Sequence, residues 1–282
     1  MSPIAPETTV GPVSLTVAGL DRSLRWYDRA LGLAPAAGGV RDGTATLTAG
    51  GDDLLELHEE PGARPVHHHT GLYHYALLVP DRSDLARWLA HAIKERISLT
   101  GLSDHIVSEA IYLRDPDSHG IEIYRDRPRD QWERDGDQIR MATDPLDLES
   151  LMAAGEGGAA RLPAATRMGH VHLHVADIPA AEAFYRDALG FDETARLGDQ
   201  ASFFSAGGYH HHLGVNTWTG QGATPPPPGS AALRHATIVL PDPGERARVA
   251  ERAGAAGAAP VEVEDGILVR DPSQNALVLT VR

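Results

Sequence analysis

Three histidines alternate along one short segment of the chain. His170, His172 and His174 occupy every second position of "GHVHLHV" (169–175), with aliphatic residues between them. Successive side chains of a β-strand point to opposite faces of the sheet, so a strand here would gather the three imidazoles on one face. Imidazole is a common transition-metal ligand and a frequent general acid or base. We therefore expect the histidine face to line a polar site and the aliphatic face to pack against a helix.

The composition narrows the chemistry that such a site could perform. The 282 residues include 15 histidines and no cysteine, so histidines and carboxylates must supply any metal ligands. A net charge of −14 disfavours binding to a nucleic-acid backbone. The sequence contains no apolar run long enough to span a membrane, and "MSPIAPETTV" lacks the features of a signal peptide. We expect a cytoplasmic protein that acts on small molecules, with no nucleic-acid or membrane partner; a homo-oligomer remains open.

The chain contains four related units. Residues 11–33 align without gaps with residues 169–191, and each segment predicts a strand, a turn and an amphipathic helix that ends at a glycine, Gly32 or Gly190. Two further segments match each other in the same way, "LYHYALLVPD" and "LRHATIVLPD", and each is followed by a helical stretch and later by an Asp-Pro turn between two strands. Each unit therefore predicts a βαβββ module, and the fold class is α+β.

The four modules, numbered one to four below, cover residues 11–60, 72–126, 169–219 and 233–282. They predict a first domain over residues 1–128 and a second over residues 169–282, with cup-shaped, barrel-like sheets. The segment 129–168 is predicted as a linker that contains one short helix in "PLDLESLMAAG" and a flexible Gly/Ala-rich stretch, "AGEGGAA". A single module leaves one face of its sheet concave, so two modules must associate to close a cup.

This arrangement, with its "FY…LGF" helix and its "DP…G.E" strands, resembles the glyoxalase/bleomycin-resistance/extradiol-dioxygenase superfamily, the vicinal oxygen chelate fold. The resemblance covers nearly the whole chain. Within the superfamily, "SDHIVSEAIYLRDPDSHGIEIYRDRP" and "GGYHHHLGVNTW" are most similar to bacterial catechol 2,3-dioxygenases. The resemblance implies a metal at the floor of a cup, bound by a histidine from the first strand of each of two modules and by a glutamate from a final strand.

The implied ligand positions are complete only across the two halves of the chain. The first-strand position in modules one to four is occupied by Pro12, His74, His170 and His235. The final-strand position is Glu122 in module two and Val278 in module four, while module one offers Glu56. Only modules two and three together supply His74, His170 and Glu122. We therefore expect one metal cup built from modules two and three, with modules one and four as a metal-free companion.

The resemblance also implies catalytic roles for three other residues. Similar enzymes carry an Asp-His pair before a strand tyrosine, here Asp104-His105 and Tyr112, and a histidine on the last strand of the partner module, here His211. A ferrous ion, with manganese(II) as an open alternative, would leave three positions for a catechol and O2. His211 would act as general acid and base, with His212 as the alternative if the register slips by one residue. Tyr112 and His105 would hydrogen-bond substrate oxygens.

These residues predict an extradiol ring-cleaving dioxygenase that inserts O2 into a catechol and gives a 2-hydroxymuconic semialdehyde-type product. A metal-dependent glyoxalase-type isomerase is an alternative, but it usually has two glutamates and this cup offers only Glu122. A metal-free, antibiotic-binding protein of the same fold is a second alternative, and it would leave His105, Tyr112 and His211 without a role. Both stay open, because similarity in this fold follows the scaffold better than the reaction.

Overall fold

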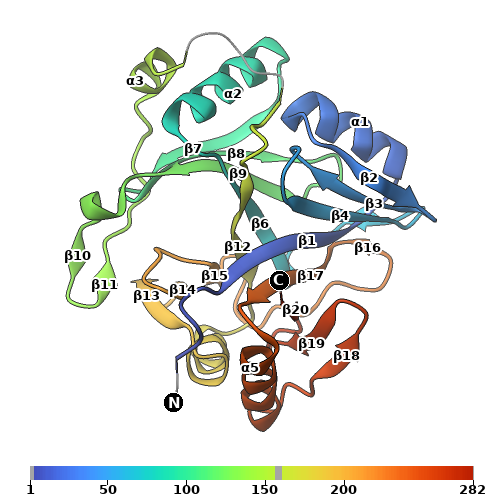
Figure 1. The fold of residues 1–282 in the computed structure, drawn as a ribbon, viewed down its shortest axis with the longest axis vertical. Coiled ribbons are helices and arrows are strands. Elements are labelled where there is room, and N and C mark those ends of the chain that lie inside the picture. Colours follow the sequence, from blue (N-terminus) through green and yellow to red (C-terminus); the bar gives the residue numbers. More distant parts are fainter. Residues whose placement is uncertain (1–2, 156–160, 282) are drawn as a thin grey trace.

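The computed structural model describes residues 3–155 and 161–281. It is an α+β structure with two eight-stranded sheets, which confirms the predicted fold class (Figure 1). No helix within these residues is both long and apolar enough to cross a membrane. The predicted Gly/Ala-rich flexible stretch falls partly on residues 156–160, which lie outside the described residues.

Each module folds as one strand, one helix and three further strands, as the repeats predict. Module one contains β1 (Thr9–Val17), α1 (Leu20–Leu31), β2 (Ala34–Arg41), β3 (Thr44–Thr48) and β4 (Asp53–Glu59). Module two contains β6 (Gly71–Leu78), α2 (Arg82–Lys94), β7 (Leu99–Asp104), β8 (Ser108–Arg114) and β9 (Gly120–Asp126). Module three contains β12 (Arg167–His174), α4 (Ile178–Glu182) continued by the π-helix η2 (Ala183–Ala188), β13 (Asp192–Leu197), β14 (Ala201–Ser205) and β15 (Leu213–Asn216). Module four contains β17 (Leu233–Leu240), α5 (Pro243–Ala255), β18 (Val261–Val263), β19 (Gly266–Arg270) and β20 (Ala276–Val281).

Both sheets combine modules from the two halves of the chain. One sheet has the strand order β13-β14-β15-β12-β6-β9-β8-β7 and therefore joins modules three and two. The other has the order β18-β19-β20-β17-β1-β4-β3-β2 and joins modules four and one. In the first sheet β12 runs antiparallel to β6, with His172 opposite His74. The predicted pairing of modules two and three is confirmed.

The helices, in contrast, pair within each half. Figure 1 shows α1 and α2 together at one end of the molecule, with α5 at the other. The Trp88 indole of α2 donates a hydrogen bond to the carbonyl of Ala30 in α1 (3.0 Å), and Arg252 of α5 donates to the carbonyl oxygens of Ala188 and Leu189. Sheets therefore connect the halves, whereas helix packing connects the modules within a half.

A buried tyrosine–aspartate hydrogen bond repeats this connection within each half. The Tyr27 hydroxyl of α1 donates to Asp115 in the Asp-Pro turn of module two (3.0 Å), and Tyr185 of η2 donates to Asp271 in module four (2.9 Å). Burial raises the pKa of both aspartates. Tyr27 and Tyr185 thus each tie the helix of one module to the Asp-Pro turn of the next module.

The central strand β12 has the predicted two faces. Val171 and Leu173 are completely buried on the helix side, while His170 and His172 lie on the concave side. Alternation along a strand therefore sets the side on which the imidazoles lie.

The α1 helix ends at Gly32, whose left-handed conformation (φ 68°) lets its N–H bond to the carbonyl of Asp28.

The segment after module two is more structured than a simple connection. It contains η1 (Arg129–Gln131), β10 (Arg134–Asp135), β11 (Gln138–Ile139) and α3 (Leu148–Ala153), and two other short strands, β5 (Arg64–Pro65) and β16 (Ser230–Ala231), pair elsewhere. The expected helix in "PLDLESLMAAG" is α3. Trp132 and Ile139 are buried with Val107 and Tyr209, so this segment, predicted as a linker, packs against both modules two and three.

Leu173→Ala should lower the free energy of unfolding by about 2–5 kcal/mol, because it opens a cavity in a fully buried position. Leu197→Ala is the matched control, since the Leu197 side chain is 56% exposed and its loss should change stability by at most about 0.5 kcal/mol. Urea denaturation followed by circular dichroism measures both. Equal effects of the two substitutions would contradict this assignment of faces.

Candidate metal centre

His74, His170 and Glu122 converge on one point at the floor of the sheet formed by modules two and three. Glu122 Oε2 lies 3.0 Å from His74 Nε2 and 3.2 Å from His170 Nε2. One ligand atom of each side chain lies within 4.8 Å of the other two, and all three side chains are buried. The antiparallel β6–β12 pair and the parallel β6–β9 pair bring these residues together from three strands.

The protonation states of this triad suit a cation. Burial lowers the pKa of His74 and of His170, so both imidazoles stay neutral near pH 7. Burial alone would raise the pKa of Glu122, but the neighbouring His170 and His74 outweigh it and hold that pKa well below its usual range. Two neutral imidazoles and one carboxylate are what a divalent metal requires of its ligands.

The hydrogen bonding of the triad is also incomplete without a further group. His74 Nε2 is buried and, within the described residues, has no aligned hydrogen-bond partner, although Glu122 is close. Leaving a buried polar atom unpaired is costly, and a metal ion placed between the three side chains would satisfy it. The donor set, two nitrogens and one carboxylate, fits ferrous iron or manganese(II).

Tyr112 and His105 lie beside the triad as a hydrogen-bonded pair. Tyr112 on β8 is opposite Glu122 on β9, and its ring centroid is 5.5 Å from that of His74. The Tyr112 hydroxyl lies 2.6 Å from His105 Nε2, while His105 Nδ1 lies 2.6 Å from the carbonyl oxygen of Ala142. A carbonyl can only accept, so Nδ1 carries the proton and Nε2 accepts from Tyr112.

A strained turn holds His105 in place. Ile106 has a φ of 70°, which is unusual for a β-branched residue. The Asp104 carboxylate accepts from the Ile106 N–H (2.9 Å) and pairs with Arg127 (2.6 Å), which also donates to the Ile106 carbonyl. Asp104 thus fixes the turn that presents His105, and does not itself line the cavity.

His211 belongs to module three and lies beside His170 of the triad. Its ring centroid lies 4.1 Å from that of His170, and its side chain lines the same cavity. His211 Nδ1 is 2.8 Å from His210 Nδ1, and His210 Nε2 is 2.8 Å from the Asp126 carboxylate. Because Asp126 accepts from His210 Nε2, His210 Nδ1 is left to accept from His211 Nδ1, and His211 Nε2 keeps a free lone pair. The sequence did not predict the parts played by His210 and Asp126; the run of three histidines was the only signal.

The histidine pair 211 and 212 differs from the prediction in one respect. Both residues directly precede β15, which begins at Leu213, so neither lies within the last strand of module three. His212 Nδ1 accepts a hydrogen bond from the backbone N–H of Ala206 (3.2 Å) and does not line the cavity. Of the two candidates, only His211 faces the triad. Burial lowers the pKa of His211 well below its usual range, which keeps the ring neutral.

The cavity above the triad has a volume of about 800 Å³. One wall comes from the segment predicted as a linker, including Ile139, Met141, Ala142 and Thr143. His172 lies on another wall, packed against Phe203, whereas His174 faces a separate cavity. The wall residues of the linker segment were missed because a connection between repeats carries no repeat pattern, although its buried Trp132 was a signal for packing.

The sheet of modules one and four, called the companion sheet below, has no equivalent set of three converging ligands among the described residues. Val278 is buried at the position that corresponds to Glu122, and His235 Nε2 lies 3.8 Å from Glu56 Oε2 with both side chains partly exposed. Within residues 3–155 and 161–281, the group His74, Glu122 and His170 is the one set of three potential ligands whose atoms converge.

Comparisons with known proteins place the chain in a family. The profile of the Glyoxalase/Bleomycin resistance protein/Dioxygenase superfamily matches residues 9–123 and 167–279, and the chain belongs to that superfamily. It is 44% identical over 288 residues to a Catechol-2,3-dioxygenase of Bacillus subtilis (strain 168), a match that covers 100% of both chains. This similarity supports an enzyme of the dioxygenase or glyoxalase kind.

Solved structures from Bacillus subtilis and Zea mays share the fold. A putative dioxygenase from Bacillus subtilis subsp. subtilis str. 168 superposes with a TM-score of 0.68 at 14% identity, over 99% of this chain and 86% of that one. Glyoxalase I from Zea mays superposes with a TM-score of 0.58 at 15% identity, over 97% of this chain and 92% of that one. At these identities, the likeness concerns the fold alone.

Glu122→Gln should leave the protein with about a tenth or less of the wild-type iron content after anaerobic loading and desalting. Supporting residues around a metal typically contribute 10–100-fold in affinity, and a direct ligand contributes more. Glu56→Gln, in the companion sheet, should retain wild-type iron content. Metal analysis by atomic emission decides: iron lost from the Glu56 variant and kept by the Glu122 variant would place the metal in the other sheet.

Proposed function

We propose that this protein is an extradiol ring-cleaving dioxygenase that acts on a catechol. The observation that carries the proposal is the buried His74, His170 and Glu122 triad at the floor of a cavity whose walls hold His211 on one side and Tyr112 on the other. The name of the 44% identical Bacillus subtilis relative, Catechol-2,3-dioxygenase, supports the same reaction. The substrates are a catechol and O2.

The triad residues would hold the metal. Ferrous iron held by His74, His170 and Glu122 would bind the catechol and O2 and would supply electron transfer between them. Manganese(II) suits the same three ligands. The remaining chemistry falls to side chains that bind the substrate and move its protons.

His211 acts as the general base. Its hydrogen bond to His210, which is in turn bonded to Asp126, leaves the His211 Nε2 lone pair available to a catechol hydroxyl. Burial keeps this imidazole neutral and therefore able to accept a proton. Once protonated, His211 can return that proton as a general acid, and the Asp126 carboxylate stabilises the charge through His210.

Tyr112 and His105 orient the substrate on the other side. Since the Tyr112 hydroxyl donates to His105 Nε2, its oxygen remains free to accept a hydrogen bond from a catechol hydroxyl. The Ala142 carbonyl fixes the His105 tautomer, which holds the Tyr112 hydroxyl in one orientation. Donors and acceptors held in place before the substrate arrives stabilise charge as it develops.

A glyoxalase-type isomerase is less consistent with the same cavity. The position on β15 opposite His172 is Gly214, whereas in module one the position opposite Ser14 is Glu56. A Cβ atom at residue 214 would lie 2.9 Å from the His172 ring, so a second glutamate has no room there. Among the described residues, one carboxylate, that of Glu122, therefore converges with the two histidines, which favours the two-histidine, one-carboxylate chemistry of oxygen activation.

The proposal predicts oxygen-dependent ring opening. Protein loaded anaerobically with ferrous iron, mixed with catechol and then exposed to air, should consume one O2 per catechol and form a yellow product. With ¹⁸O2, mass spectrometry should find both labelled atoms in the ring-opened product, because the reaction adds O2 without loss of atoms. Absence of O2 uptake with either ferrous or manganous protein would contradict the proposal.

His211→Gln should lower kcat for ring opening by about 10²–10⁴-fold, the range typical of a general acid–base group, while iron content stays at the wild-type level. His212→Gln should reduce kcat far less, since glutamine can still accept the Ala206 N–H and the residue does not line the cavity. Single-turnover kinetics on iron-loaded variants measures both. The reverse order of effects would assign the role to His212.

A further inference from the structure

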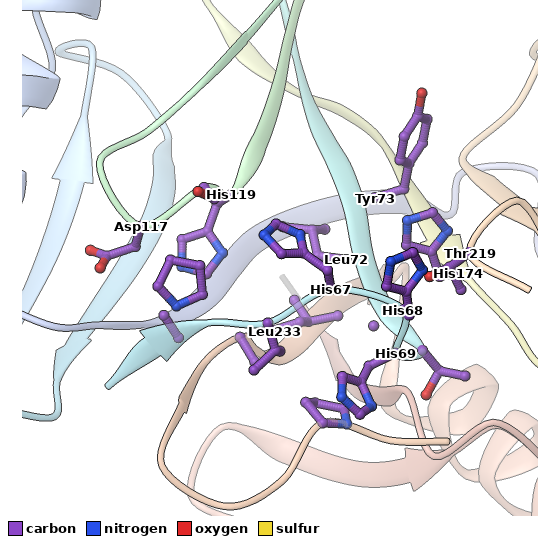
Figure 2. Close-up of a pocket in the computed structure, with 18 of the residues that line it drawn as sticks. His67, His68, His69, Leu72, Tyr73, Asp117, His119, His174, Thr219 and Leu233 are labelled. Carbon is purple, nitrogen blue, oxygen red and sulfur yellow. The ribbon is translucent and has the colours of Figure 1, made fainter. Parts of the chain in front are cut away.

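A second, smaller cavity adjoins the catalytic one. Its volume is about 400 Å³, and it lies near the junction of the two sheets. Figure 2 shows His67, His68 and His174 gathered in it, with the Tyr73 ring at one edge. The two cavities share three wall residues, Tyr73, Arg114 and Trp218. The small cavity, called the side cavity below, therefore shares part of its wall with the cavity above the metal triad.

Tyr73 and Arg114 lie on strands β6 and β8, close in sequence to residues at the metal triad. Tyr73 immediately precedes the ligand His74 on β6, and its ring lies 5.3 Å from that of Trp218. Arg114 follows Tyr112 by two residues on β8, so both side chains lie on the same face of the sheet, about 6.6–6.8 Å apart along the strand. That spacing is roughly the length of an aromatic ring with a one-carbon substituent.

Arg114 presents a positive charge that no carboxylate neutralises. Its Nη1 donates to the carbonyl of Ser118 (2.7 Å), and among the residues the structure describes no carboxylate lies within 4.0 Å of its guanidinium. The acidic residue of the side cavity, Asp117, is already paired with Arg22. Arg114 and Tyr73 both line the wall that the two cavities share, which places the charge between the cavities.

The other two arginines that line the catalytic cavity each have an acidic partner. Arg140 pairs with Glu133 (2.6 Å), and Arg196 pairs with Glu182 (3.2 Å). Within the described ranges, Arg114 is thus the one arginine on the wall of either cavity that lacks an acidic partner. Arg114 is exposed, so its charge is accessible to a carboxylate that a substrate would bring.

We propose that Arg114 binds a carboxylate carried on a short side chain of the catechol, and that the side cavity receives this end of the substrate. The inference rests on the proposed ring-cleaving function and deepens it, because it names the substrate class: a catechol with an acidic substituent. The ring hydroxyls lie at the triad, and the carboxylate lies beyond Tyr73, at the mouth of the side cavity. Arg114 is then a residue that determines specificity and takes no part in proton transfer.

The repeat supplies a matched control. Arg270 in module four occupies the position equivalent to Arg114, before the same Asp-Pro turn, and its Nη1 donates to the Gln274 carbonyl (3.0 Å) as Arg114 does to that of Ser118. Arg270 lines neither cavity. Arg270→Met and Arg114→Met therefore lose the same local turn contact, but only Arg114→Met loses the charge near the substrate.

The test compares 3,4-dihydroxyphenylacetate with its uncharged amide, 3,4-dihydroxyphenylacetamide. Wild type and Arg270→Met should cleave the acid with a kcat/KM about 10- to 100-fold above that of the amide, the range expected of a hydrogen bond to a charged group. In Arg114→Met the ratio should fall to about one. Anaerobic calorimetry on iron-loaded protein should show a Kd for the acid that is below that of the amide by the same factors, which separates binding from turnover.

Equal kcat/KM values for acid and amide in the wild type, or a preference that survives in Arg114→Met, would overturn the Arg114 assignment while leaving ring cleavage established. A preference lost equally in Arg270→Met would show that the turn contact, and not the charge, is responsible. If iron-loaded wild type cleaves unsubstituted catechol but neither binds nor cleaves the acid, this inference fails while ring cleavage stands; if it cleaves none of the three compounds, both fail.

Discussion

The antiparallel pairing of β6 with β12 is the interaction on which the site depends. It sets His172 opposite His74 and so brings His170 of module three beside the His74 and Glu122 of module two. A shift of this pairing by one residue would turn every side chain of β12 to the other face and would move the imidazoles into the helix-packed core. The apolar face of β12 opposes that shift, because Val171 and Leu173 are fully buried there.

Two sets of contacts keep the pairing in register. Sheets join modules two with three and one with four, whereas helix packing and the Tyr27–Asp115 and Tyr185–Asp271 hydrogen bonds join the modules within each half. Each module is therefore tied to one partner through its strands and to another through its helix. The segment after module two adds a third contact, since its buried Trp132 packs with Tyr209 of module three.

The sequence was most informative where a repeat could be compared with itself. The absence of a ligand at Pro12 and Val278 left modules two and three as the only complete pair, and the sheet order agrees. It was least informative where partners are remote and unrepeated. The Asp126–His210 bond joins residues 84 positions apart, and the Ala142 carbonyl that orients His105 belongs to a segment with no counterpart elsewhere in the chain. The Tyr27–Asp115 bond could have been anticipated, because both residue types recur at the equivalent positions Tyr185 and Asp271.

The most direct test is a crystal structure of the protein loaded anaerobically with ferrous iron, with the ion located by anomalous scattering at the iron edge. One strong peak is expected within bonding distance of His74 Nε2, His170 Nε2 and a Glu122 carboxylate oxygen, and none in the sheet of modules one and four. A peak between Glu56 and His235, or no peak at the triad, would contradict this expectation.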